Sequence, residues 1–532
     1  MTNLTRRAAL IAAAAISSRI ASAEADPRPI ITIAVQRIAT SNTLCIINEA
    51  SNVGTRHYNS YHEPLIDTDW TGDLSLRPGL AEAWTQIDGR TVEFKLRQGV
   101  KFHNGDTLTA QDVAFTFGER MFGTDAERAA VAGAPRDPSW APAKVRAGAA
   151  TAFPAIERIE IIDPHTIRFV NKIPDVTLLG RISMRVGSIV NARQHREAAS
   201  WFDWARKPVG TGPYKVAEYV AENRLILDAF DDYWGGKPPI RQLRFIEVPE
   251  LSSRINGLLS GQYDFACDIT PDQIDGIDKT AKFEVKGGLI TNMRVLNFDT
   301  HFPALADKRV RLALSLAVDR AAIVETIWGG RTRVPRGSQY PFFGPMYISD
   351  HVSPGYDPAR ARTLLKDAGY NGAPIPYRLV NNYYTNQTTT AQALVEMWRA
   401  VGLNVQLEIK ENWGQVLATN VPRAINDNSM TAFFNDPVSF IPSNFGVKGD
   451  MPLNGFWKNA EAEAQVAILE ASTDMATRQA AIRRIMTIAE TEDPALIILH
   501  ETANFTAKRR DIQWQPAKSF VMDFRSRNFK IG

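Results

Sequence analysis

Short apolar and alternating segments predict strands through much of the first 250 residues. Residues 30–35 (IITIAV) are apolar and β-branched, which is typical of a buried strand. Residues 91–96 alternate between polar and apolar side chains and follow the segment 84–87, so the two predict a strand pair. The same signals predict five more strands, at residues 159–162, 166–170, 214–219, 224–229 and 241–248.

Helical spacing of apolar residues first appears over residues 109–121 and dominates after residue 307. Thr109 can cap the first helix, with Asp112 at its third position. Pro358 and Gly369 mark the start and end of another helix. Further helices are predicted at 309–327, 388–400, 458–471 and 474–492, and strands at 377–380 and 403–409. Strands followed by strand–helix alternation indicate α/β lobes.

Two loops carry residue types that invite a specific interpretation. The segment Gly210-Thr211-Gly212-Pro213 predicts a sharp turn before a strand, in which glycine supplies an unusual φ. The acidic segment 231–236 (DDYWGG) is open to two interpretations: a metal site, or a turn whose Asp side chains bond local amides. We favour the turn. Residues 124–152 are rich in Ala, Gly and Pro and predict a surface excursion.

The first 23 residues predict a cleaved signal peptide. Arg6 and Arg7 precede an apolar stretch over residues 8–18, and Ala21-Ser22-Ala23 offers a small-residue cleavage site. The paired arginines favour twin-arginine export, and an ordinary secretory signal is the alternative. No cysteine stands at the cleavage point, so we expect an unanchored periplasmic protein.

Charge and motif content exclude several classes of function. The chain has 61 basic and 58 acidic residues, and loss of residues 1–23, which hold three arginines and no acid, leaves 58 of each. This balance gives no reason to expect nucleic-acid or anionic-membrane binding. G-x-S-x-G, P-loop and H-E-x-x-H motifs are absent, and the eight histidines are scattered. We therefore expect neither an enzyme nor a cofactor or metal site.

The two cysteines, Cys45 and Cys267, stand 222 positions apart. In an oxidising compartment they can form a disulfide. The alternative is two buried thiols that pack as small apolar side chains. Sequence alone leaves both open.

Four ordered blocks resemble the extracellular solute-binding proteins of the peptide/nickel type, which serve ABC importers. The first block is YHEPLIDTD, RPGLAEAW and DGRTVEFKLRQGVKFHNGDTLTAQDVAFTF; the second is PVGTGPYKV, FDDYWGGKPPIRQLRFIEVPE and GLLSGQYDFACDI. The third is VRLALSLAVDRAAIVETIWGG, and the fourth is YDPARARTLLKDAGY with WRAVGLNVQLEIKENWGQVL behind it. Together they span nearly the whole chain after residue 23.

This resemblance implies a two-lobed α/β periplasmic-binding-protein fold (type II, large class), with a third domain inserted in the N-terminal lobe. By the family pattern, lobe I is residues 24–58, 205–290 and 498–532, the inserted domain is 59–204, and lobe II is 291–497. The implied function is to enclose a peptide-like or other small solute between the lobes. A monomer would then deliver it, chemically unchanged, to an inner-membrane permease and ATPase complex.

The resemblance implies that the loop after strand 403–409 and the stretch near 430–440 line the cleft. The run 381–384, at the end of a predicted strand, adds amide and hydroxyl groups suited to a hydroxylated ligand. The candidates in lobe II are Trp413, Phe433, Phe434, Asn435, Asp436, Asn381, Asn382, Tyr383 and Tyr384, and those from the other side are Asn48, Tyr58 and Tyr61. The alternatives are a Trp413 packed within lobe II and a polar surface turn at 381–384.

Phe433 stands where the peptide binders carry an Asp that pairs with the ligand's α-amino group. Ordinary short peptides are therefore in doubt, and an opine, a sugar conjugate or a metal chelate is the alternative ligand. A chemosensory binder that meets no importer is the alternative role.

Overall fold

A ten-stranded mixed sheet runs through the computed structural model, which describes residues 26–49, 51–118 and 152–532. Its order is β14-β13-β15-β12-β16-β11-β1-β10-β9-β8. The strands are β1 (Ile30–Val35), β8 (Tyr214–Val220), β9 (Arg224–Ala229), β10 (Gln242–Glu247), β11 (Phe265–Cys267), β12 (Phe283–Phe298), β13 (Ile375–Val380), β14 (Val405–Lys410), β15 (Ile425–Thr431) and β16 (Leu496–Arg509). β1 pairs in parallel with β10 and β11, and β13 pairs in parallel with β14 and β15.

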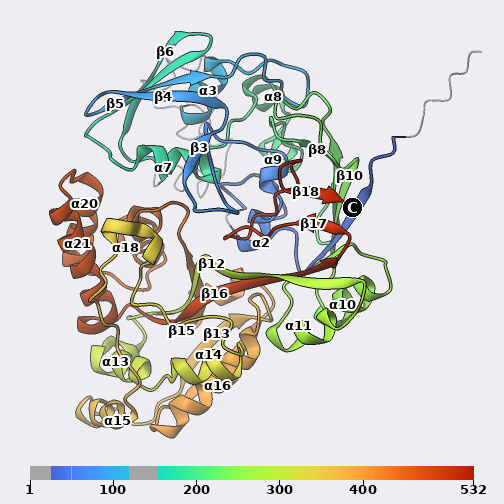
Figure 1. The fold of residues 1–532 in the computed structure, drawn as a ribbon. Helices are drawn as coiled ribbons and strands as arrows, with labels where there is room; N and C mark the ends of the chain where they lie inside the picture. Colours follow the sequence, from blue (N-terminus) through green and yellow to red (C-terminus); the bar gives the residue numbers. More distant parts are fainter. Residues whose placement is uncertain (1–25, 50, 119–151) are drawn as a thin grey trace, which may run out of the picture.

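Two long antiparallel strands, β12 and β16, connect the two halves of the molecule. They lie side by side across the middle of Figure 1. We call the part built on β1 and β8–β11 the first half, and the part built on β13–β15 the second half. The pairing of β12 with β16 shifts register between Leu289 and Met293 and again after Arg294, which places an irregularity where the halves meet.

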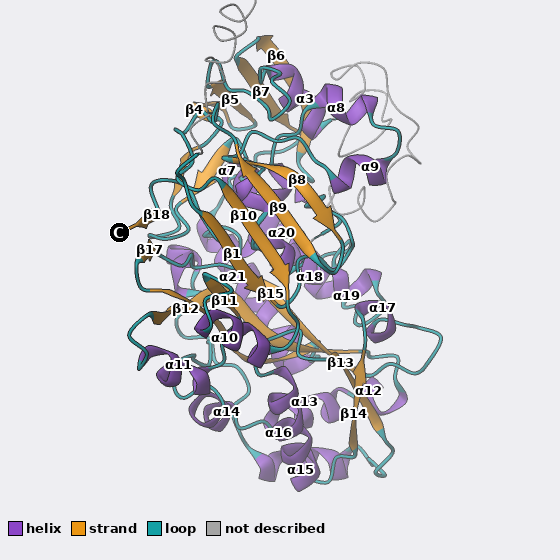
Figure 2. Cartoon of the chain, turned by 90° about the vertical axis from the view of Figure 1, so that its right-hand side faces the viewer, coloured by secondary structure: helices purple, strands orange, loops and turns teal. Residues whose placement is uncertain are grey.

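Helices cover the second half more heavily than the first. Those beside the first half are α2 (Asn52–Thr55), α10 (Leu251–Leu259) and α11 (Pro271–Asp278). Those of the second half are α12 (Pro303–Ala306), α13 (Lys308–Leu316), α14 (Arg320–Thr326), α15 (Pro358–Asp367), α16 (Gln387–Ala400), α17 (Trp413–Val416), α18 (Ile441–Phe445), α19 (Asp450–Leu453), α20 (Ala460–Ala471) and α21 (Met475–Thr487). Figure 2 shows α13, α15 and α16 gathered at the end remote from β4–β7.

A separate four-stranded sheet lies beyond the first half, at the top of Figures 1 and 2. Its order is β4-β5-β7-β6, and its core includes Phe94, Phe117 and Phe169. Its elements are β4 (Ala81–Asp88), β5 (Thr91–Leu96), α3 (Ala110–Phe117), β6 (Ile156–Asp163), β7 (Thr166–Asn171), α7 (Leu178–Ser183), α8 (Ala192–Glu197) and α9 (Trp201–Arg206). All of them except the last two residues of α9 fall within the predicted insertion, 59–204, whose bounds stay a prediction. Two small pairs complete the strands, β2 (Ile66–Thr68) with β3 (Leu76–Pro78) and β17 (Ile512–Trp514) with β18 (Phe529–Ile531).

Most predicted elements are confirmed within a few residues. Thr109 caps α3 and forms a capping box with Asp112, as predicted. The single helix predicted over 309–327 is wrong: the chain forms α13 and α14 instead. Asp319 starts the second helix, because its carboxylate accepts a hydrogen bond from the Ala322 amide at 2.9 Å. The predicted signal peptide 1–23, the last turn predicted for 109–121 and nearly all of the excursion 124–152 lie outside the described residues.

The glycines of the 210–213 turn are required for close approach and not for their φ, which corrects the predicted reason. Neither Gly210 nor Gly212 has a positive φ. A Cβ on Gly210 would overlap the carbonyl oxygen of Tyr61, and one on Gly212 would lie 2.7 Å from the carbonyl oxygen of Ser60. The turn therefore packs directly on the backbone of residues 60–61.

The acidic segment 231–236 forms ion pairs, and the two cysteines are buried thiols. The predicted reason for this turn is corrected, because the Asp231 carboxylate forms ion pairs, with Arg28 at 2.7 Å and with Lys237 at 3.0 Å, in place of the predicted bonds to local amides. Among the described residues, no cluster of three or more His, Cys, Asp or Glu could hold a metal ion. Cys45 and Cys267, both described, are separate buried thiols in different core clusters. No helix in the described ranges is long and apolar enough for a bilayer crossing.

The buried His57 predicts a loss of stability in acid. Burial lowers the pKa of His57 from 6.5 to about 4. Its Nε2 donates to the Ile38 carbonyl oxygen at 3.0 Å, so Nδ1 accepts from the Tyr61 hydroxyl. Between pH 6.5 and 4 the unfolded chain binds more protons at this residue than the folded chain, so stability falls as pH falls. We expect a loss of about 3 kcal/mol from this residue by pH 4.

Urea unfolding between pH 7 and pH 4 measures this dependence. His57→Gln should reduce the loss between pH 7 and 4 by about 3 kcal/mol without abolishing it, because burial also lowers the pKa of His103 and His500. His301→Gln, at a side chain that is 74% exposed, should leave it unchanged. A pH dependence in His57→Gln as steep as in the parent protein would contradict the assignment.

Candidate functional site

A cavity lies between the two halves, beside the strands that connect them. We call it the interlobe cavity. It holds about 430 Å³ of space free of atoms, including its opening to solvent. The first half contributes Gln36, Asn52, Val53, Arg56 and Asp268, the second half contributes Arg294, Trp328, Tyr383, Tyr384 and Thr385, and Thr502, Ala503, Asn504 and Phe520 complete the lining. Both halves therefore supply polar side chains to the same cavity.

The ends of parallel strands place the polar groups at this cavity. Gln36 directly follows β1 and Asp268 directly follows β11, and these two strands are parallel neighbours. On the opposite wall, Tyr383 and Tyr384 lie just beyond the carboxyl end of β13. Ligands of open α/β sheets bind at such carboxyl ends, where loops bring side chains together.

The wall of the first half carries a buried ion pair that is only partly satisfied. Arg56 Nη2 lies 2.6 Å from Asp268 Oδ1, and the two side chains are 2% and 14% exposed. The other pair of atoms, Arg56 Nη1 and Asp268 Oδ2, is buried and finds no hydrogen-bond partner in the described part of the chain. Buried polar atoms of native proteins are nearly always paired, so an unused donor beside an unused acceptor is unusual.

The wall of the second half carries a fully used ion pair. Arg294 pairs with Asp427, and both side chains are at most 5% exposed. Asp427 Oδ2 also accepts from Gln387 Nε2 at 2.8 Å. The Arg294 guanidinium carbon lies 3.3 Å from the centre of the Tyr384 ring, in a cation–π contact. This network fixes the ring of Tyr384 at the cavity.

Direct contacts join the two halves around the cavity. Gln36 Nε2 donates to the Asn382 carbonyl oxygen, and Asn52 Nδ2 donates to Ser429 Oγ at 3.2 Å. Farther out, the β4–β7 region also contacts the second half, because Arg181 in α7 pairs with Glu470 in α20 at 2.7 Å. The structure therefore shows the halves closed on each other.

Three residues of the predicted 381–384 run take part in this arrangement. Tyr383 and Tyr384 line the interlobe cavity, and Asn382 contributes the carbonyl oxygen bound by Gln36. Asn381 is exposed. Trp413 is half-buried behind the tyrosines, with its ring centre 5.1 Å from that of Tyr383 in a perpendicular contact. It supports the wall and is absent from the lining.

The predicted segment 433–436 lies away from the interlobe cavity. Phe433 is half-buried, and the Arg185 guanidinium carbon lies 5.2 Å from its ring centre. Phe434 is buried against Gly180 of α7. Asn435 is exposed. Asp436 accepts from the Val438 amide at 2.9 Å and pairs with Arg478 at 2.7 Å, so its carboxylate holds the local loop.

The predicted residues of the first half also lie outside the interlobe lining. Asn48 donates to Thr43 Oγ1 at 3.2 Å. Tyr58 and Tyr61 are buried in the core of the first half. Burial raises the pKa of both phenols. Tyr58 also borders a second cavity, described next.

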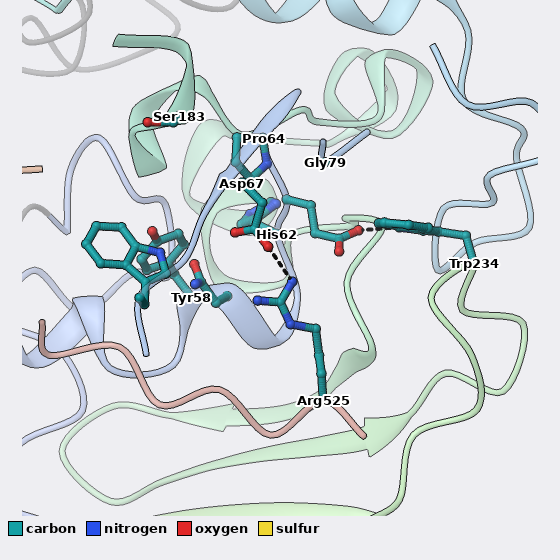
Figure 3. A pocket seen from close by; sticks show the side chains of 11 residues that line it. Tyr58, His62, Pro64, Asp67, Gly79, Ser183, Trp234 and Arg525 are labelled. Atoms are coloured by element: carbon teal, nitrogen blue, oxygen red, sulfur yellow. Dashed lines mark hydrogen bonds and ion pairs between the residues drawn. The ribbon is translucent and has the colours of Figure 1, made fainter. Parts of the chain in front are cut away.

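This second cavity joins the first half, the C-terminal segment and the region of the predicted insertion. Figure 3 shows Asp67 facing Arg525, with the Trp234 ring at the far side. Asp67 Oδ2 accepts from Arg525 Nη1 at 3.0 Å. Glu63 accepts from Tyr233 Oη and Trp234 Nε1, both at 2.7 Å, and from Thr211 Oγ1 at 3.0 Å. The carboxylates here are fully engaged by protein, which indicates a structural joint.

Sequence reasoning missed Gln36, Arg56, Asp268, Arg294 and Trp328 as cavity residues. A signal existed for two of them, since Gln36 and Asp268 each follow an apolar strand directly. Arg294 lies within the buried run of β12, where a charged residue is itself unusual. Arg56 and Trp328 have no distinguishing sequence signal.

Comparison with known proteins relates the chain to extracellular solute-binding proteins. A family model for bacterial extracellular solute-binding proteins, family 5 (middle part), matches residues 75–451. Di/tripeptide-binding protein 2 of Pseudomonas aeruginosa (strain UCBPP-PA14) is 28% identical over 468 residues, which cover 83% of this chain and 84% of the relative. The dipeptide-binding protein of Escherichia coli (strain K12) is 27% identical over 483 residues, 85% of each chain.

A solved structure shares the fold. It is the dipeptide-binding protein of Pseudoalteromonas sp. SM9913 in complex with Met-Leu, with a TM-score of 0.83 and 20% identity, covering 94% of this chain and 100% of that chain. The likeness confirms the predicted two-lobed α/β fold. Because the family model spans most of the chain in addition, this protein belongs to the bacterial extracellular solute-binding proteins of family 5.

Proposed function

We propose that this protein is the solute-binding component of an ABC importer and that the interlobe cavity holds its solute. The observation that carries the proposal is a cavity lined from both halves, which are connected through the strand pair β12 and β16. Rotation about such a connection opens and closes the cavity with little change inside either half. A ligand that contacts both walls stabilises the closed arrangement.

The role involves no bond cleavage. The side chains that line the cavity carry amides, phenols and charged groups, which can hold a solute by hydrogen bonds and ion pairs. The family carries solutes to a membrane permease and its ATPase. We place the protein in the periplasm as a monomer, exported through the signal at residues 1–23. The surfaces that the two halves present together when closed would then be read by the permease.

The solute we propose is a small peptide-like compound. Two relatives are named for dipeptides or tripeptides, and the related structure holds Met-Leu. Phe433 stands where the peptide binders carry an Asp, so a second class of ligand stays a candidate: an opine, a sugar conjugate or a metal chelate. Phe433 lies against Arg185 and outside the interlobe lining, so the ammonium partner of the peptide binders has no counterpart there.

Ligand binding should raise the melting temperature by a few degrees, because a ligand at 100 times its Kd adds about 2.7 kcal/mol to the stability of the folded state. The probes are dipeptides, tripeptides, opines, sugars and metal chelates, tested on the chain from residue 24. Small-angle scattering on the same samples should show compaction, and mass spectrometry should recover each probe intact. If every probe leaves both the melting temperature and the scattering curve unchanged, or if products accumulate, the proposal fails.

A further inference from the structure

We infer that the solute carries an α-amino-acid head group, with its carboxylate bound by Arg56 and its ammonium bound by Asp268. This inference rests on the proposed function, since it assigns the ligand of the same cavity. It places the charged end of the ligand on the wall of the first half. The carrying observation is the pair of unused atoms, Arg56 Nη1 and Asp268 Oδ2, at one place in the interlobe lining.

The ion pair is built in a way that leaves these atoms available. An Arg and a carboxylate can form two parallel hydrogen bonds, but here Arg56 donates to Asp268 from Nη2 to Oδ1 alone. The remaining N–H and the remaining oxygen are buried, so each loses its contact with water without gaining a protein partner. A ligand that supplies one acceptor and one donor on neighbouring atoms would satisfy both at once.

The backbone at Asp268 supports a role beyond simple charge pairing. Asp268 has a φ of 59°, in the left-handed region, directly after the buried strand β11. Non-glycine residues adopt this conformation uncommonly, and strained backbone tends to persist where it positions a functional group. The conformation turns the chain at the strand end, where Asp268 lines the cavity.

The charges select the class of ligand. A sugar hydroxyl can donate and accept, but it gives neither Arg56 nor Asp268 an opposite charge. A dicarboxylate would bring a second negative charge to Asp268, and a diamine would bring a second positive charge to Arg56. An ammonium and a carboxylate on one carbon match both groups, and charge-assisted hydrogen bonds are stronger than neutral ones.

The opposite wall indicates that the ligand extends across the cavity. Trp328 Nε1 is also buried without a hydrogen-bond partner among the described residues. It belongs to the second half and lines the same space. An acceptor on the body of the ligand, such as an amide or carbonyl oxygen, would therefore find a donor there while the head group stays on Arg56 and Asp268.

Isothermal titration with matched probes tests the head group. The probes are the free L-amino acids, their N-acetyl forms, which lack the ammonium, and their amides, which lack the carboxylate. Dipeptides carry the two charges on different carbons and are the comparison, which should bind more weakly than a compound with both charges on one carbon. We expect binding to require both charged groups, with a loss of roughly 10-fold to 100-fold when either is blocked. Free amino acids or amino-acid conjugates should retain binding if they keep both groups on one carbon.

Asp268→Asn tests the residue itself. Asn tolerates the left-handed conformation and keeps an oxygen for Arg56 Nη2, so the backbone at 268 should persist while the negative charge is lost, at a cost in stability from the buried Arg56 charge. Affinity for the zwitterionic probes should fall by roughly 10-fold to 100-fold. Asp264→Asn is the matched control, because Asp264 pairs with Arg509 at 2.8 Å at the other end of β11 and is absent from the interlobe lining.

The outcomes separate this inference from the proposed function. If a probe compacts the protein in scattering but binds equally well after acetylation or after Asp268→Asn, the head-group assignment is overturned and the solute-binding role stands. If no probe stabilises or compacts the protein, both are overturned. Loss of affinity in Asp268→Asn with unchanged affinity in Asp264→Asn, measured at a temperature where both free proteins are folded, supports the assignment.

Discussion

Replacing Asp427 with alanine should lower the free energy of unfolding by about 3–5 kcal/mol, because it strands the buried Arg294 charge. The Asp427 side chain is 2% exposed and that of Arg294 is 5% exposed. The substitution also removes the acceptor of Gln387 Nε2. Urea unfolding followed by circular dichroism measures the loss.

The same substitution should weaken solute binding. Arg294 and Tyr384 both line the interlobe cavity, and Asp427 fixes the guanidinium that lies over the Tyr384 ring. Without this carboxylate we expect the Arg294 guanidinium to reorient toward the cavity, where water or the ligand can accept its hydrogen bonds. Calorimetric titration with whichever probe binds the parent protein will show the change as a weaker affinity.

Two controls test whether the lost stability comes from the buried Arg294 charge. Asp350→Ala breaks an exposed pair with Arg483, whose side chains are 71% and 47% exposed, and should cost less than about 1 kcal/mol. The double substitution Arg294→Met with Asp427→Leu removes both charges and should recover most of the lost stability. A loss in Asp427→Ala no larger than that in Asp350→Ala would show that the pair is not what holds this wall.

Local sequence signals were sufficient for most of the fold. The IITIAV run forms β1 because its apolar side chains are buried on both sides of the sheet, and Thr109, Pro358 and Gly369 delimit helices by local capping. The failure at 309–327 has an equally local cause. Asp319 caps a new helix, but apolar spacing continues through the break and hides it.

The site was less accessible to sequence reasoning, because the cavity lining comes from residues as distant as Gln36 and Phe520. Tyr383 and Tyr384 could be named because they follow a predicted strand directly and carry hydroxyl groups suited to a ligand. The Arg56–Asp268 pair joins residues 212 positions apart, and only three-dimensional contacts show that one atom of each is left unused.

A valine at Gly180 should hold the β4–β7 region, which includes α7, away from the second half. It should weaken solute binding by roughly 10-fold to 100-fold, since affinity scales with the fraction of protein that can close. A Cβ at this position in α7 would lie 2.5 Å from Cδ2 of Phe434, whose ring is buried in the second half. The neighbouring Arg181–Glu470 pair, at 2.7 Å, crosses the same contact. Scattering at saturating probe should show a larger particle than the parent protein.

Gly276→Val is the matched control, because Gly276 also lies in a helix, α11, but has open space within 4 Å of an added Cβ. Both substitutions carry the same cost of a β-branched residue in a helix, so a difference in affinity between them reports the contact with Phe434. Adding Phe434→Ala to Gly180→Val should restore closure, because it removes the ring that the valine meets. If Gly180→Val binds as tightly as Gly276→Val, the contact of α7 with Phe434 does not limit closure, and the Gln36–Asn382 and Asn52–Ser429 contacts are enough to bring the halves together.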